Sequence, residues 1–381
     1  MNFIELFSAG SLGALGFYFL SFLAALLVII FVHEFGHFIV ARLCGVKVDA
    51  FSIGFGRELF GFNDRHGTRW KICLWPIGGY VKFEGDANAA SVPGTDDAAR
   101  SSPGSLHAQP VPQRMAIVAA GPIANFLLAI AIFAATFTLV GMPYMRPIVS
   151  EVIAGSAAET AGLKPGDLVK SVAGERVTAF GQIQEKVFLR PGEELTVVIE
   201  RGGSDLSLQI TPQAKEVKDN FGGSMKVGQL GVRHQPAADE PLYQKYPPHT
   251  ALVIGAERTW HVIELTFKFL GKIIIGEQSI KQIGGAVSIG KGAGDAASGG
   301  FANFMFFIAF LSVSIGIVNL FPIPMLDGGH LVFYALEAIR GKPLGPTAQE
   351  WGFRIGFSCV VMLMLLGLFN DAGRLSNVFG S

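Results

Sequence analysis

The sequence has few charged residues, few cysteines and no excess of charge of either sign. Asp, Glu, Lys and Arg make up 16% of its 381 residues, whereas 50% are hydrophobic and the mean hydropathy is +0.44. This composition is too apolar for an ordinary soluble enzyme and too polar for a pure helix bundle, so it favours a membrane protein with a water-exposed part. Its 30 basic and 30 acidic residues cancel, and we expect no nucleic acid partner.

The three cysteines indicate neither a structural element nor a metal site. Cys44, Cys73 and Cys359 are far apart and form no C-x-x-C pair, which argues against a disulfide framework and a thiolate metal site. The N-terminus carries Glu5 but no Lys or Arg before a long apolar run. The run is also too long for the hydrophobic region of a signal peptide, and we interpret it as a retained first membrane span.

Three ionisable residues interrupt this first apolar run, which extends from about Gly16 to Leu43. An ionisable group at the centre of a membrane helix costs about 2.5–3.5 kcal/mol, so such a cluster indicates a functional site. On a helix, His33 and His37 share one face and Glu34 lies beside them. This is the H-E-x-x-H pattern, in which two imidazoles bind Zn²⁺ and the carboxylate takes a proton from zinc-bound water. A chance match would fall more often on a polar surface, so we favour the metal site.

A second polar break interrupts the third predicted span, in the sequence N-L-F-P-I-P-M-L-D-G-G-H from Asn319 to His330. Pro322 and Pro324 remove backbone donors, which a membrane helix tolerates only where its backbone lines an enclosed or wet cavity. Asp327 follows the break and is the expected third zinc ligand. His330, one turn later, is expected to pack beside the site rather than to bind the metal.

The periodicity of the chain predicts a polytopic α-helical membrane protein with four transmembrane helices, a membrane-associated β-hairpin region and one α+β domain. The segment 161–169 resembles the signature turn of PDZ domains of bacterial proteases. Residues 250–275 are apolar but carry a polar stripe, so we expect a helix on the membrane surface or against the soluble domain. The predicted segments are the first transmembrane helix, 1–45; β-hairpins on the cytoplasmic side, 46–85; a flexible linker, 86–113; the second transmembrane helix, 114–142; the PDZ-like domain, 146–213; a polar connector with the amphipathic helix and a Gly-rich loop, 214–300; and the third and fourth transmembrane helices, 301–340 and 351–371.

Basic residues predict the orientation. They gather in the loop after the first span and in the loop before the fourth, and the positive-inside rule assigns both loops to the cytoplasm. Both termini and the PDZ-like domain are then extracytoplasmic. The basic residues are Arg42, Lys47, Arg57, Arg65, Arg69, Lys71 and Lys82 in the first loop, and Arg340 and Lys342 in the second.

The predicted hairpins have two possible roles beside the site. Exposed strands can pair with an extended peptide by strand addition, which makes Gly54, Phe55 and Gly56 candidate substrate-binding residues. The hairpins can equally form a structural cap over the site. The broken segment at Pro322 and Pro324 is a second place where a substrate helix can unwind.

With these motifs together, the chain resembles site-2 proteases of the bacterial regulator-of-sigma-E type, over nearly its whole length. The resemblance implies zinc-dependent cleavage of single-span proteins, such as anti-sigma factors or remnant signal peptides, within the bacterial inner membrane, in stress responses and after a site-1-type protease has acted. It also implies that His33, His37 and Asp327 bind zinc, that Glu34 is the catalytic base and that Asn319 lies near the substrate strand. The chain has one PDZ-like segment where some members have two.

One competing function is a membrane zinc-binding or transport protein without proteolytic activity, in which Glu34 is only a counter-charge. Transporters usually place several acidic or histidine residues along successive spans. The second and fourth predicted spans have none apart from their ends. We therefore favour the protease.

Overall fold

The computed structural model describes residues 11–86, 102–218, 224–235 and 243–379. These residues form two compact units. The first takes in residues up to 134, 252–266 and 284–371, and the second takes in 135–251, 267–283 and the residues after 371.

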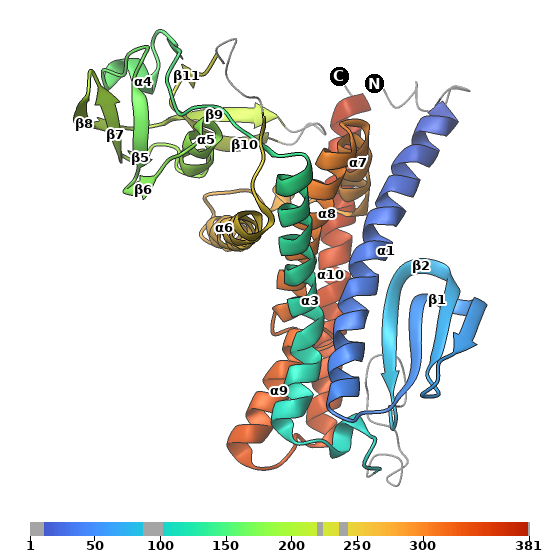
Figure 1. Cartoon of the computed structure of the whole chain (residues 1–381). Helices are drawn as coiled ribbons and strands as arrows, with labels where there is room; N and C mark the ends of the chain where they lie inside the picture. The colour runs from blue at the N-terminus through green and yellow to red at the C-terminus, as the bar shows by residue number, and fades with distance from the viewer. Residues whose placement is uncertain (1–10, 87–101, 219–223, 236–242, 380–381) are drawn as a thin grey trace. The chain divides into compact units, whose positions relative to one another are not determined.

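Four helices among the described residues are long and apolar enough to cross a membrane, as predicted, and they run alongside one another in Figure 1. Between α1 and α8, the buried residues Ala25, Ile29, Ile308 and Leu311 form an apolar core cluster. These helices provide the framework on which the site is built. They are α1 (Ser11–Leu43), α3 (Val111–Leu139), α8 (Phe301–Leu320) and α10 (Pro346–Phe379).

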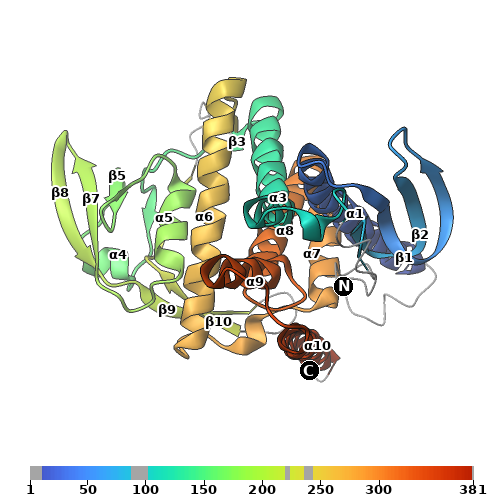
Figure 2. The same ribbon diagram turned by 90° about the horizontal axis from the view of Figure 1, so that it is seen from below.

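Strands β1 (Val48–Asn63) and β2 (Arg69–Phe83) form a curled sheet beside α1 (Figures 1 and 2). Phe51 of β1 pairs with Val81 on one side and with Trp70 on the other, so the long strands fold back on themselves. The bend in β1 falls at Gly54 and Gly56, both with φ +88°, a conformation that glycine adopts without steric cost. Phe51 is buried against α1, which fixes the sheet to the helix that carries His33 and His37.

The predicted linker, 86–113, is only partly within the described residues, because 87–101 lie outside them. Its second half differs from the prediction, since it is packed. Leu106, in the 3₁₀ turn η2 (Leu106–Ala108), is fully buried in the cluster between α1 and the sheet. His107 lies 3.0 Å from the buried carboxylate of Asp86. The buried side chain of Leu106 and the contact between His107 and Asp86 thus hold this polar segment in place.

The Gly-rich stretch 284–300 was predicted to be a loop, and the structure corrects this. It forms the helix α7 (Ala286–Ser298). The buried carboxylate of Asp371 on α10 accepts hydrogen bonds from the main-chain N–H groups of Gly285, Val287 and Ser288 at 2.9–3.3 Å. Gly294 lies against the ring of Tyr18 on α1. Capping and close packing therefore override the low helix propensity of Gly290, Gly292 and Gly294.

Residues 250–275 form the helix α6 (Pro248–Ile274), which is not among the four candidate membrane spans. Its part within the first unit buries Gly255, Thr259 and Val262 on one face, and Gly255 lies against the backbone of α3 at Ile130. Figure 1 shows α6 nearly end-on, so that it crosses α3. The short turn η3 (Ile280–Gln282) follows it.

The second unit contains a four-stranded antiparallel sheet. The sheet order is β6-β5-β7-β8. Its strands carry the buried core residues Val172, Val197, Ile199 and Ile210. The elements of this unit are β3 (Met142–Pro143), β4 (Glu151–Val152), α4 (Ala157–Thr160), β5 (Leu168–Val172), β6 (Glu175–Arg176), α5 (Phe180–Phe188), β7 (Leu195–Arg201), β8 (Ser204–Ile210), β9 (Gln213–Lys218), β10 (Ser224–Gln229), β11 (Val232–Arg233) and β12 (Tyr243–Gln244).

This unit ends later than the boundary at Gln213 that the sequence predicted. Strand β9 pairs with β10, and β11 pairs with β4 through Val232 and Val152. Leu230 is 5% exposed and belongs to the same core. Mostly polar strands on the surface of a small unit have too few apolar residues to be recognised by pattern.

Candidate active site

Helices α1 and α9 (Asp327–Arg340) bring three potential metal ligands together. Nε2 of His33 lies 3.2 Å from Nε2 of His37 and 3.2 Å from Oδ2 of Asp327. Nε2 of His37 lies 3.5 Å from Oδ1 of Asp327. The three side chains are 11–17% exposed. Among the residues that the structure describes, no other group of three such side chains converges in this way.

This donor set fits zinc. A tetrahedral zinc ion with bonds of about 2.0–2.1 Å to nitrogen places neighbouring donor atoms roughly 3.3–3.4 Å apart. The two imidazole nitrogens are 3.2 Å apart, and each lies 3.2–3.5 Å from one of the two carboxylate oxygens of Asp327, which is close to this spacing. Two imidazoles and one carboxylate are also a ligand set typical of catalytic zinc sites, which keep a further position open.

Close packing of α3 against α1 shapes the site from one side. A Cβ atom on Gly36 would lie 2.4 Å from the carbonyl oxygen of Ala120, and one on Gly121 would lie 2.3 Å from Nε2 of His37. The two helices therefore touch backbone to backbone, as small residues permit in membrane helices. This contact brings polar groups of α3 within reach of both imidazoles.

Each histidine has a partner on α3 for its second ring nitrogen. Nδ1 of His37 lies 2.9 Å from the carbonyl oxygen of Ile117. Pro122 lies inside α3 and has no N–H to donate to the carbonyl oxygen of Val118, the residue after Ile117. Nδ1 of His33 lies 3.2 Å from the side-chain amide of Asn125. Such partners fix the ring orientation of metal-binding histidines.

The chain break before α9 positions Asp327. Helix α8 ends at Leu320, and Met325 has φ +89°, which is unusual for a residue with a side chain. A Cβ atom on Gly328 would lie 2.2 Å from the carbonyl oxygen of Phe321, and one on Gly329 would lie 2.5 Å from that of Ile323. Only glycines permit this tight reversal, which presents Asp327 as the first residue of α9.

A cavity of about 250 Å³ opens beside the three ligands and is lined by Glu34 as well. The main-chain N–H of Val81 on β2 donates a hydrogen bond to the Glu34 carboxylate. The remaining wall comes from Gly79, Tyr80, Phe83, Val118, Asn319, Met325, Leu326, His330 and Tyr334. The cavity is thus lined by the candidate metal ligands, by the carboxylate of Glu34 and by one side of strand β2.

Comparison with known proteins agrees with this geometry. The family model described as peptidase family M50 matches residues 21–363. The chain belongs to this family.

The M50 chain is similar along most of its length to named relatives. It is 44% identical over 367 residues to an Agrobacterium fabrum protein named as a zinc metalloprotease, covering 95% of this chain and 97% of that protein. It is 38% identical to the metalloprotease MmpA of Caulobacter vibrioides, covering 93% and 95%. It is 34% identical to the regulator of sigma-E protease RseP of Escherichia coli, covering 93% and 98%. The chain is therefore a site-2-type zinc metalloprotease, and its four apolar helices make it an intramembrane one.

Of the residues that the sequence singled out in this M50 peptidase, five line the cavity together, namely His33, Glu34, His37, Asn319 and Asp327. His330 also lines it, with its ring 5.7 Å from that of Phe353.

The other predicted substrate-binding residues, Gly54, Phe55, Gly56, Pro322 and Pro324, do not line the cavity. Phe55 stacks on the ring of Tyr80, with centroids 5.8 Å apart. Pro324 packs on α10 at Gly356.

Sequence reasoning missed the groups on α3 and β2. Ile117, Gly121, Asn125 and Val81 were not among its candidate site residues, although all four lie beside His33, Glu34 or His37. The motif Ala120-Gly121-Pro122 with Asn125 was the available signal, because small residues and an amide in a membrane helix indicate a close helix contact.

Proposed function

We propose that this M50 peptidase cleaves the membrane-spanning segments of single-span proteins, of the anti-sigma-factor or remnant-signal-peptide type, in regulated intramembrane proteolysis. The supporting observation is that His33, His37 and Asp327 converge beside Glu34 in one cavity, and that the two histidines and Glu34 lie on a helix long and apolar enough to cross a membrane. An enzyme that acts on water-soluble substrates would not need its active site on a helix of membrane length.

His33, His37 and Asp327 are the proposed zinc ligands. When bound there, zinc supplies a Lewis acid that polarises a carbonyl group and acidifies water. Glu34 takes a proton from the attacking water and returns it to the leaving amine nitrogen. The carboxylates of Asp327 and Glu34 also offset the charge of the dication, so the assembled group costs less in a membrane than its members would separately.

A helical substrate must unwind before hydrolysis, because its carbonyl groups are already hydrogen-bonded within the helix. Within the described residues, segment 79–83 of β2 pairs only with β1, and Gly79, Tyr80 and Val81 line the cavity. We infer that the unwound segment adds to this edge as a strand. Asn319 contacts it, Phe55 supports the edge through Tyr80, and Gly54 and Gly56 shape the bend of β1. Pro322 and Pro324 act indirectly, by holding the turn that presents Asp327.

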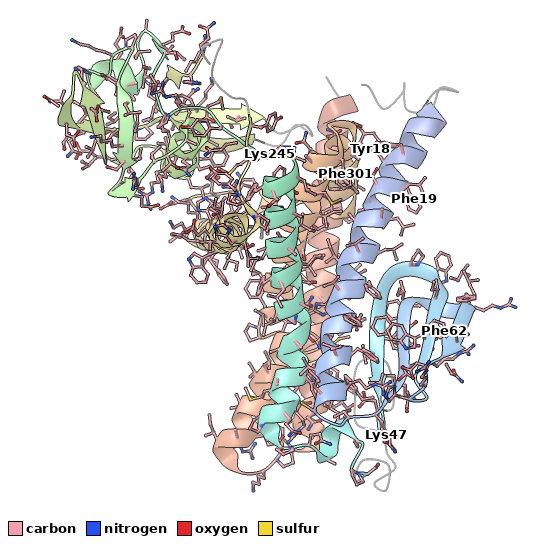
Figure 3. The ribbon with its side chains drawn as sticks, in the orientation of Figure 1. Tyr18, Phe19, Lys47, Phe62, Lys245 and Phe301 are labelled. Atoms are coloured by element: carbon pink, nitrogen blue, oxygen red, sulfur yellow. The ribbon has the colours of Figure 1, made fainter. Side chains whose placement is uncertain are left out.

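The proposed orientation places the sheet of β1 and β2 in the cytoplasm. Lys47, which follows α1 and belongs to its basic loop, lies at the opposite end of these helices from Tyr18 (Figure 3). By the positive-inside rule the Tyr18 end, both termini and the PDZ-like unit are extracytoplasmic, in the bacterial inner membrane. The PDZ-like unit then meets the outer domain of a substrate, either as a gate or by binding peptide, after a site-1-type protease has trimmed it.

The test uses purified full-length protein in detergent with a single-span substrate. Mass spectrometry of the products is expected to locate the cleaved bond inside the apolar segment. Glu34→Gln is expected to slow cleavage at least about 100-fold, the usual share of a general base, while stoichiometric zinc is retained. Removing zinc with a chelator abolishes cleavage, and adding zinc restores it.

Glu350→Gln is the matched control, because Glu350 is 62% exposed on α10 and pairs with Arg354 one turn later. It should cleave at the parent rate. Unchanged cleavage by Glu34→Gln, or a cleavage site outside the apolar segment, would refute the proposal. In cells, Glu34→Gln enzyme should make trimmed single-span fragments accumulate in the membrane proteome.

A further inference from the structure

Asn125 on α3 is fully buried beside the candidate zinc ligand His33. As placed, its side-chain nitrogen lies 3.2 Å from Nδ1 of His33. Its side-chain oxygen is buried and has no hydrogen-bond partner among the described residues. A buried polar group of this kind calls for an explanation.

The chemistry of a metal-binding imidazole decides which amide atom belongs at Nδ1. Nε2 of His33 faces His37 and Asp327, so zinc would bind there and the single proton of the neutral ring would sit on Nδ1. Nδ1–H is a donor and requires an acceptor. His37 meets this rule, because its Nδ1 faces the carbonyl oxygen of Ile117, which only accepts. An amide nitrogen facing Nδ1–H of His33 would set two donors against each other.

Turning the Asn125 amide by 180° resolves this conflict. The oxygen and nitrogen of an amide exchange positions with almost no change in shape, and their assignment depends on the hydrogen-bond network. After the turn, the oxygen accepts from Nδ1–H of His33, and the nitrogen takes the position that the oxygen leaves.

The backbone around Asn125 is itself fixed, because the buried Ser312 on α8 donates a hydrogen bond of 2.8 Å to the carbonyl oxygen of Asn125. The main chain that carries this side chain is therefore held by a neighbouring helix as well as by the hydrogen bonds of α3.

We propose that Asn125 is a positioning residue whose side-chain oxygen accepts the Nδ1–H of His33 and thereby keeps Nε2 of His33 free for zinc. The inference rests on the proposed function, because it assumes that His33 binds zinc. The two imidazoles are then oriented from one helix, by a main-chain carbonyl at Ile117 and by a side-chain carbonyl at Asn125. Removing such a partner typically weakens metal binding about 10–100-fold.

The first test measures the zinc dissociation constant of full-length protein in detergent, by competition with a chromogenic chelator. Asn125→Leu has a similar volume but no acceptor and is expected to bind zinc about 10–100-fold more weakly than the parent. Asn125→Asp keeps an acceptor oxygen and is expected to stay close to the parent. Ser314→Ala is the matched control on α8, because it removes a hydrogen bond of 3.0 Å to the carbonyl oxygen of Phe310 within the same helix, and it too should stay close to the parent.

The second test needs no variant. With ¹⁵N-labelled histidine, the ring of His33 in the zinc-loaded parent should show a protonated Nδ1 and a metal-bound Nε2. An unprotonated Nδ1 would overturn the inference, as would an Asn125→Leu variant that binds zinc like the parent. Equal losses in Asn125→Leu and Asn125→Asp, with metal-free proteins that unfold like the parent, would also overturn it in favour of packing. If the parent itself binds no zinc, the proposed function fails together with this inference. If the parent binds zinc and only the Asn125 expectations fail, the proposed function stands.

Discussion

Gly121 of α3 lies directly against His37 of α1, because a Cβ atom on Gly121 would be 2.3 Å from Nε2 of His37 and 2.9 Å from Cε1 of His33. A side chain larger than hydrogen therefore does not fit at this position unless an imidazole or a helix moves. We therefore expect metal binding by the histidines of α1 to depend on a glycine at this position of α3.

Gly121→Ala should therefore displace His37 or push the two helices apart. We expect zinc affinity to fall at least about tenfold, in the range seen when the surroundings of a metal ligand are disturbed, and proteolysis to fall with it. Gly16→Ala is the matched control, since a Cβ atom at Gly16 of α1 meets nothing within 4 Å, and it should leave zinc affinity unchanged. Equal zinc affinities for Gly121→Ala and the parent would show that the helices adapt to the added methyl group.

The site shows which features a sequence reveals in such a protein. His33, Glu34 and His37 are recognisable because they lie within two turns of one helix, where spacing alone fixes their relative positions. Asp327 was found because a proline-broken membrane helix implies a cavity at that depth. In both cases the signal is local in the sequence.

Contacts between elements left no such local signal. The partners of the imidazoles, Ile117 and Asn125, depend on how closely α3 approaches α1, and the Val81 N–H depends on the curl of the sheet. Helix α7 was missed because its glycines disfavour a helix on their own, and Asp371, about 80 residues away, compensates for them. Tertiary contacts override propensity in these places.

The cap of α7 can be tested with Asp371→Ala. This change removes the acceptor of the N–H groups of Gly285, Val287 and Ser288. The loss of a helix cap costs about 1–2 kcal/mol, so amide hydrogen exchange at residues 285–288 is expected to accelerate about 5–30-fold. Asp295→Asn serves as control, because Asp295 accepts a hydrogen bond from Tyr18 and caps no amide of α7. Similar acceleration in both variants would mean that α7 is held by its packing on α1 and not by the cap.

Acid should weaken the second unit through Asp167. Burial by itself would raise the pKa of this carboxyl, but hydrogen bonds from the Arg201 guanidinium and the Lys164 N–H, with their charges, lower the pKa below its usual range. A carboxyl with a lower pKa in the folded state stabilises that state above its unfolded pKa of about 3.9. This stabilisation is lost as the pH falls through the folded-state pKa.

The corresponding measurement compares the parent with Asp167→Asn by amide exchange of β7. At pH 7 the variant is expected to exchange roughly tenfold faster, as befits the loss of charged hydrogen bonds. Since parent and variant are compared at each pH, the intrinsic pH dependence of exchange cancels. The difference should shrink below about pH 4, and a difference that stays constant down to pH 2 would contradict this role of Asp167.

The ion pair between Arg114 and Glu337 joins α3 to α9, the two helices that carry Gly121 and Asp327. Its nitrogen–oxygen distances are 2.6 and 3.0 Å, and its side chains are only 10% and 14% exposed. Removing one partner of such a buried pair leaves an uncompensated charge and costs about 3–5 kcal/mol, whereas replacing both partners by apolar residues is often neutral.

We therefore expect Arg114→Met and Glu337→Leu each to lower the free energy of unfolding and to weaken zinc binding, because α9 then holds Asp327 less firmly. The double variant should lose less than either single one, which a double-mutant cycle of detergent unfolding measures as a coupling energy of about 0.5–3 kcal/mol or more. Arg114 also lies over the ring of Tyr334, with its Cζ 4.8 Å from the ring centroid, so Arg114→Met should cost more than Glu337→Leu. Additive losses of unfolding free energy would show that the two charges act separately. Zinc affinities equal to that of the parent in both single variants would show that the glycine turn alone positions Asp327.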